Sequence, residues 1–173
     1  PDGVEPLGAP PGTRFLMAFD NTATDKTKRA LQLAVSPDGF TFEVLQPPPP
    51  LGESFADTSV SLVFDPLTQD FVAYGRDDST PDQHAGEHCG NFPINFNMKS
   101  VRGVRRATSP PDNRTGTPSL HNFSVTTPVS FAFDRLDPQC LDVYNSAAVI
   151  VAPHGAVNDY ERAYLGFPSV YLH

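Results

Sequence analysis

The sequence predicts an all-β protein, and three observations support this class. Proline accounts for 19 of the 173 residues and glycine for 12. Asp outnumbers Glu and Arg outnumbers Lys, which is a turn-rich composition, because Asp and Pro favour turns whereas Glu and Lys favour helix surfaces. No segment has apolar residues at sustained helical spacing, and short apolar runs separated by turn residues recur along the chain.

Nine segments are predicted to be strands, each an apolar or alternating run bounded by turn residues. They are 14–19, 30–35, 40–45, 59–64, 71–76, 101–107, 121–125, 143–151 and 163–172. The third segment alternates, which places Phe40, Phe42 and Val44 on one face. The proline run 47–50 ends this strand and predicts an extended connector. The segment 65–70 reads as a hairpin turn with proline at a favoured position.

Two echoes in the sequence indicate an internal repeat. The segment AVSPD at 34–38 is echoed by ATSPPD at 107–112, and each precedes an aromatic strand. The segment DTSVS at 57–61 is echoed by DVYNS at 142–146, and each precedes an apolar strand and a hairpin. Four strands in a repeated unit predict a partial β-propeller of four-stranded antiparallel blades. A β-sandwich with similar strand spacing is the alternative.

The repeat divides the chain into four parts. Residues 1–13 are predicted to be a linker or arm, 14–50 a partial blade, 51–128 a complete blade with an insertion at 77–100, and 129–173 the start of the next blade. A closed propeller needs at least about four blades. Since the chain also begins with Pro1 rather than Met, we expect it to be a fragment whose partners are the remaining blades of a longer chain.

The charge of the chain limits its partners. The net charge is −8 at pH 7, which disfavours contact with phosphate backbones and predicts no nucleic-acid partner. No run of 18 apolar residues is present, so no membrane span is expected, and no signal peptide is recognised. The sequons at 113–115 and 122–124 would permit glycosylation in a secreted protein. The cellular location therefore stays open, and a secreted or extracellular location is one of the alternatives.

Three segments carry a resemblance to a known family. SPDGFTF at 36–42, FADTSVSLVFDPLTQDFVAYGR at 55–76 and DVYNSAAVIV with YLGFPSVYLH at 142–173 resemble blade motifs of five-bladed propeller glycosidases, the glycoside hydrolase family 32 and 43 relatives. The resemblance implies five blades in the full protein, carbohydrate as the ligand, no cofactor, and an active site where the innermost strands converge. Phe42 and Phe123 stand where the family often has Trp.

Asp57 and Asp142 are the candidate catalytic residues, because they precede the inferred innermost strands at echoed positions. Glycoside hydrolysis uses two carboxyl groups, one that protonates the leaving oxygen and one that activates water or attacks. The alternative is that both side chains only cap turns. We predict that the isolated 173-residue chain is inactive and prone to associate, because an open fragment has unpaired sheet edges.

Arg76, Tyr144 and Asn145 are the candidate substrate-binding residues. The planar guanidinium of Arg76 can bind a carboxylate or sugar hydroxyls, and the ring of Tyr144 can stack on a sugar face. The alternative for Arg76 is a surface ion pair with Asp77 or Asp78.

The cysteines, the histidines of the insertion and an arginine group offer three further features. Cys89 could pair with Cys140 and connect the insertion to the next blade. The run from His84 to Cys89 has some zinc ligands but lacks a fourth one nearby, so no metal is predicted. Arg102, Arg105 and Arg106 read as a solvated face.

Two further functions remain as alternatives to glycoside hydrolysis. The first is a non-catalytic propeller module that binds glycan or protein. The second is a sialidase-like propeller, because SPDGFTF approaches the Asp-box pattern Ser-x-Asp-x-Gly-x-Thr-Trp. It lacks one residue between Asp38 and Gly39.

Overall fold

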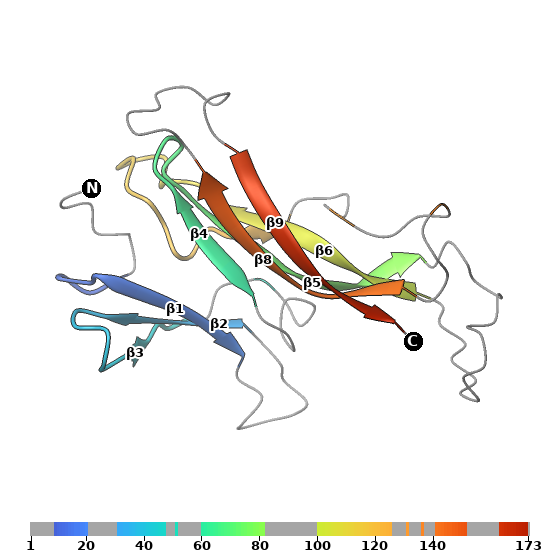
Figure 1. Ribbon diagram of the computed structural model, residues 1–173. Helices are drawn as coiled ribbons and strands as arrows, with labels where there is room; N and C mark the ends of the chain where they lie inside the picture. Colours follow the sequence, from blue (N-terminus) through green and yellow to red (C-terminus); the bar gives the residue numbers. More distant parts are fainter. Residues whose placement is uncertain are drawn as a thin grey trace.

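The computed structural model describes residues 9–20, 31–47, 51, 60–81, 100–125, 131, 136, 141–151 and 163–172, and these are all-β. They form nine strands (Figure 1). The strands are β1 (Phe15–Asp20), β2 (Leu31–Ser36), β3 (Glu43–Val44), β4 (Ser61–Asp65), β5 (Asp70–Pro81), β6 (Ser100–Ser109), β7 (Ser124–Val125), β8 (Leu141–Val151) and β9 (Ala163–Leu172). None of the described segments is a helix with the length and hydropathy needed to cross a membrane.

The nine strands form three antiparallel sheets in chain order. The first sheet is β1-β2-β3, the second is β4-β5-β6-β7, and the third is the hairpin β8-β9. Each strand pairs with the next one along the chain within its sheet, so the first two sheets are simple meanders and the third is a single hairpin. The described residues form neither a closed barrel nor a closed propeller.

The all-β prediction is confirmed, and every predicted strand position contains an observed strand. The lengths differ at several of them. β5 runs on to Pro81 and β6 begins at Ser100, so both ends of the predicted insertion 77–100 belong to strands. The predicted strand 121–125 pairs only at Ser124 and Val125.

The prediction of a regular strand over 40–45 was wrong for its first half. The side chain of Asp38 accepts hydrogen bonds from the backbone amides of Phe40 and Thr41, at 2.8 and 2.9 Å. The hydroxyl oxygen of Ser36 accepts the amide of Gly39 at 2.9 Å. These bonds satisfy the amides locally, so the segment is a turn and Phe40 is 92% exposed. Side chains of this kind compete with the sheet for backbone partners.

Gly39 occupies a position in this turn that a larger residue fits poorly. Its φ is +80°, which strains any residue with a Cβ, although a Cβ built there would be in ordinary van der Waals contact with the ring of Phe15, at 3.4 Å. We expect Gly39→Ala to lower the free energy of unfolding by about 1–2 kcal/mol, the cost of a left-handed conformation for a residue with a Cβ. Denaturant unfolding measures this cost. Gly166→Ala is the control, because Gly166 has no positive φ and open space around it. Equal effects of the two changes would contradict the prediction.

The first echo in the sequence corresponds to a repeat in the sheet register. Ala34 of β2 pairs with Met17 of β1 on one side and with Val44 of β3 on the other. Ala107 of β6 makes the equivalent pairs with Ala73 of β5 and Val125 of β7. The units β1-β2-β3 and β5-β6-β7 therefore have the same strand order and register, and each echoed segment leads into the turn before the last strand.

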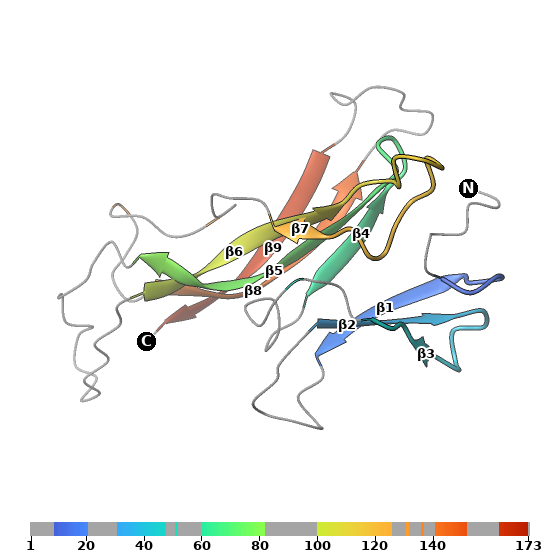
Figure 2. The ribbon, with the colours of Figure 1, turned by 180° about the vertical axis from the view of Figure 1, so that it is seen from behind.

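The second sheet is the middle of three layers. One face of the second sheet packs against β2 of the first sheet and forms a buried apolar cluster with it. The second sheet contributes Phe71, Ala73 and Ala107, and β2 contributes Leu31, Leu33 and Val35. The hairpin β8-β9 covers the other face, with β8 against β4, β5 and β6, as Figures 1 and 2 show from opposite sides. Alternation along the strands sends neighbouring residues of β5 and β6 to these two different interfaces.

Candidate functional site

A polar and aromatic cluster lies between the second sheet and the hairpin β8-β9. We call it the interlayer cluster, and its members are Asp65, Tyr74, Arg106 and Tyr164. Asp65 ends β4 and is fully buried. The hydroxyl of Tyr164, from β9, donates a hydrogen bond to the Asp65 carboxylate at 2.5 Å. This bond joins two segments of the chain that are 99 residues apart.

Two side chains of the second sheet surround Tyr164 on this interface. The rings of Tyr74 and Tyr164 have centroids 6.2 Å apart and are tilted by 60°. The guanidinium carbon of Arg106 lies 5.8 Å from the centre of the Tyr164 ring, within the range of a cation–π interaction. Because Tyr74 and Arg106 are paired across β5 and β6, both face the hairpin.

The local sequence explains why Asp65 is held inside the structure. It begins the turn between β4 and β5, and its carboxylate also accepts the amide of Leu67 at 3.0 Å. The turn closes with Gln69 at φ 61°, whose side-chain amide donates to the carbonyl of Pro66 at 2.8 Å. The Asp65 carboxylate therefore accepts hydrogen bonds both from its own turn and from the neighbouring layer. A buried carboxylate needs such partners, because burying an unpaired charge is very unfavourable.

Three predicted site residues lie in the first half of β8. Asp142 pairs with Tyr171 of β9, and Asn145 pairs with Ser169. The register shifts between Val143 and Asn145, so Tyr144 lies at a β-bulge. Their side chains, and all of Asp57, are outside the described residues. The separation of the Asp57 and Asp142 carboxyl groups therefore stays untested.

Arg76 is the predicted site residue whose side chain is described. It is only 7% exposed, so it is not a surface side chain. The side chains of Asp77 and Asp78 lie outside the described residues, so the predicted ion pair with either of them stays untested. Arg76 lies two residues after Tyr74 on the same strand face, and that face is covered by β8-β9. Arg76 is thus buried toward the hairpin whose strand β8 contains the positions of Asp142, Tyr144 and Asn145.

Sequence reasoning missed the interlayer cluster. The sequence pattern indicates only a turn at Asp65 and a solvated face for Arg106. Arg106 is half-buried and lies over Tyr164, so that interpretation is wrong for it, and Arg105 is half-buried as well. Burial of these residues depends on β9 lying across the second sheet, and no local pattern carries that information.

The predicted cysteine pair and the histidine-containing segment of the insertion are not tested by the structure. Cys89, Cys140 and the segment from His84 to His88 lie outside the described residues. Within the part of the chain that is described, no group of three or more His, Cys, Asp or Glu side chains is arranged as a metal site.

The two echoed loops each hold an aspartate in the same type of turn, exposed in the case of Asp38 and partly exposed in the case of Asp112. Asp38 accepts the amides of the residues two and three positions later, and so does Asp112, from Arg114 and Thr115 at 2.9 and 3.0 Å. Hydrogen bonds to the charged form lower the pKa of a carboxyl group. The amides of Thr41 and Phe40, followed by the Ser36 hydroxyl, lower the pKa of Asp38 below its ordinary 3.8. The amides of Arg114 and Thr115 lower the pKa of Asp112.

These lowered pKa values predict how the loops respond to acid. A carboxyl group with a lower pKa in the folded chain stabilises the fold above its ordinary pKa, and loses that contribution as the pH falls through the folded value. We expect carboxyl NMR titrations of Asp38 and Asp112 to have midpoints below 3.8. The same groups in urea-unfolded chain are the control. Coincident midpoints in the two states would contradict the hydrogen-bonded turns.

Comparisons of the chain with protein-family models, with curated proteins and with solved structures find no match.

Proposed function

We propose that the chain is part of a carbohydrate-active propeller that hydrolyses glycosidic bonds. In this proposal Asp57 and Asp142 supply the paired carboxyl groups, and Arg76, Tyr144 and Asn145 bind the sugar. The three layers are successive blades of a propeller. The resemblance of three segments to propeller glycosidases motivates this assignment, which is an analogy between motifs.

One observation carries most of the support. Arg76 is buried on the face of β5 that β8-β9 covers, and the first half of β8 holds Asp142, Tyr144 and Asn145. A β-bulge falls at Tyr144, and bulges are frequent next to active sites because they redirect a side chain. The buried guanidinium and the bulged strand thus belong to one interface between adjacent layers. The repeated register of the first two sheets supports the blade interpretation.

The first test is carbohydrate binding by the folded 173-residue chain on a glycan array. We expect binding to one class of glycan, and at least a tenfold loss with Asp142→Asn. Asp112→Asn is the matched control, because Asp112 is a carboxylate in a surface loop of the second sheet, and binding should persist. No binding to any glycan by chain that is folded by circular dichroism would refute the carbohydrate proposal.

Turnover separates the hydrolase from the binding module. In a protein that contains all the blades, hydrolysis of a bound glycoside that is lost in both Asp57→Asn and Asp142→Asn would establish the paired-carboxylate reaction. Binding without turnover, in a protein that contains all the blades, would favour the non-catalytic module. If Arg76→Lys loses binding to acidic sugars but keeps binding to neutral ones, sialidase-like recognition is favoured. The reason is that the guanidinium binds a carboxylate in a bidentate manner.

A further inference from the structure

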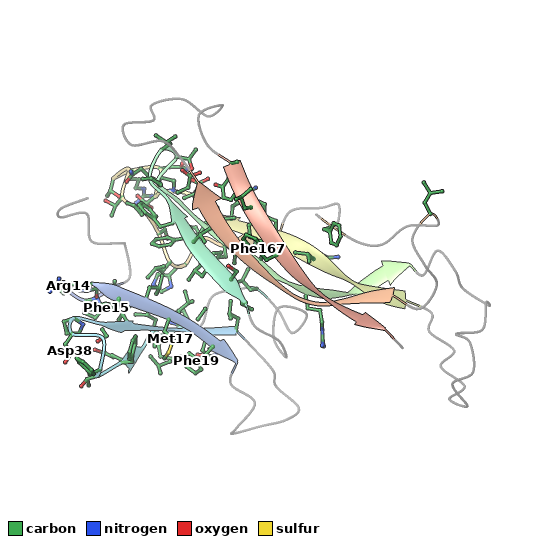
Figure 3. The ribbon with its side chains drawn as sticks, viewed as in Figure 1. Arg14, Phe15, Met17, Phe19, Asp38 and Phe167 are labelled. Atoms are coloured by element: carbon green, nitrogen blue, oxygen red, sulfur yellow. The ribbon has the colours of Figure 1, made fainter. Side chains whose placement is uncertain are left out.

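The outer face of the first sheet exposes an apolar stripe. Phe15, Met17 and Phe19 alternate along one face of β1 (Figure 3), and Phe15 and Met17 are 45% and 39% exposed. Val44, which is 44% exposed, lies on the same face, because it pairs with Ala34 and Ala34 pairs with Met17. We call these side chains the β1 face. Contiguous apolar surface of this kind marks an interaction site.

The internal repeat indicates what such a face packs against. Phe15 takes the register position that Phe71 has in the second sheet. Met17 likewise takes the position of Ala73. Those two residues of the second sheet are 6% and 0% exposed, because the apolar face of β2 covers them. The equivalent cover for the β1 face is therefore another apolar sheet face, which would lie on the side of the first sheet that points away from the second sheet.

The opposite end of the stack exposes a second apolar face. Leu165 and Phe167 of β9 are 44% and 60% exposed. They alternate with Tyr164, which binds Asp65 of the second sheet, so they point away from that sheet. We call them the β9 face. The stack of three layers thus begins with one apolar sheet face and ends with another.

We propose that the β9 face of one copy of this chain binds the β1 face of a second copy. The contact continues the order of layers already present within each chain, with the third layer of one copy placed before the first layer of the next. Each copy carries both halves of the contact, so the association is head-to-tail. Such a contact gives a ring if its rotation closes and a filament if it does not. This proposal rests on the repeat and not on the carbohydrate chemistry, and it makes further copies of this chain, rather than further blades of a longer chain, the source of the layers on both sides.

The charge of the chain predicts how this association depends on salt. Each copy carries −8, so copies repel one another at low ionic strength. Salt screens this repulsion, while burial of the apolar faces is not weakened by screening. Association should therefore strengthen between low and moderate salt, the reverse of what an interface built on ion pairs would show.

Sedimentation velocity over a wide range of concentrations tests the proposal on the 173-residue chain. We expect concentration-dependent association, with the dissociation constant raised at least about tenfold by Met17→Glu and by Phe167→Glu, since each places a charge in an apolar contact. Leu136→Glu is the control, because Leu136 is 95% exposed and lies outside the nine strands. Circular dichroism establishes that each variant is folded, and Met17→Lys provides a second variant of the β1 face.

Mixing the two variants decides the geometry. A head-to-tail contact predicts that Met17→Glu and Phe167→Glu, each weakened alone, form a heterodimer when mixed, because one retains the β9 face and the other retains the β1 face. A monomer at every concentration would overturn the proposal and would favour additional sheets from a longer chain as the cover. Association that only Met17→Glu and Met17→Lys weaken would also overturn it, in favour of a symmetric contact between two β1 faces.

Discussion

Replacing Asp65 with alanine is expected to destabilise the fold by about 3 kcal/mol. The substitution removes the acceptor for the Tyr164 hydroxyl and for the Leu67 amide. Leaving a buried donor unsatisfied costs roughly 1–3 kcal/mol, and hydrogen bonds to charged groups contribute roughly 1.5–3 kcal/mol. Such a loss is a large share of the total, because a folded domain is stable by only about 5–15 kcal/mol. Denaturant unfolding of wild type and variant gives the difference.

A double-mutant cycle assigns this effect to the bond between layers. Tyr164→Phe removes the donor and keeps the ring that packs against Tyr74 and Arg106. If the two groups interact, the double variant Asp65→Ala/Tyr164→Phe will lose at least about 1 kcal/mol less than the sum of the single changes. Asp38→Ala is the matched control for Asp65→Ala. It also removes a carboxylate from a turn, but an exposed one, so it should lower the free energy of unfolding by less. Additive effects in the cycle would show that Asp65 stabilises only its own turn.

The strands and the class of the fold were predictable because their signals are local. Short apolar runs bounded by Pro, Asp and Gly placed a strand at all nine positions. The echo of AVSPD in ATSPPD also corresponded to a real structural equivalence, since the same residues flank the same turn in two sheets with matching register. Both successes rest on patterns within a few residues, where side-chain alternation and turn chemistry decide the conformation.

The errors came from interactions that a linear pattern does not contain. Residues 40–45 alternate like a strand, yet the side chain of Asp38 takes the amides that a strand would offer to its neighbour. Asp65 and Arg106 belong to residue types that usually face water, and they are covered because the distant hairpin β8-β9 packs on their strands and Tyr164 contacts both of them. For the candidate site, the sequence could nominate Arg76 but could not indicate its burial, which depends on the layer that β8-β9 forms.

Truncating Leu33 is expected to have an effect of similar size in the other interface. Leu33 is 1% exposed in the middle of β2, and it belongs to the cluster that joins the first and second sheets. Leucine-to-alanine changes in a core cost about 2–5 kcal/mol, from lost transfer energy and the cavity that remains. Met17→Ala is the matched control on the opposite face of the same sheet. It should cost less, because the Met17 side chain is already 39% exposed.

Amide hydrogen exchange in Leu33→Ala tests whether the layers unfold as one unit. If the sheets share a single core, the variant will lose protection at the amides of Val72 and Ala107 in the second sheet as well as at those of β2. Loss confined to the first sheet would mean that it opens independently, and that the buried cluster is a contact between separate folding units. Joint loss would mean that each layer depends on its neighbour's face for stability. That dependence is the physical reason why the two outermost apolar faces are expected to bind a further layer.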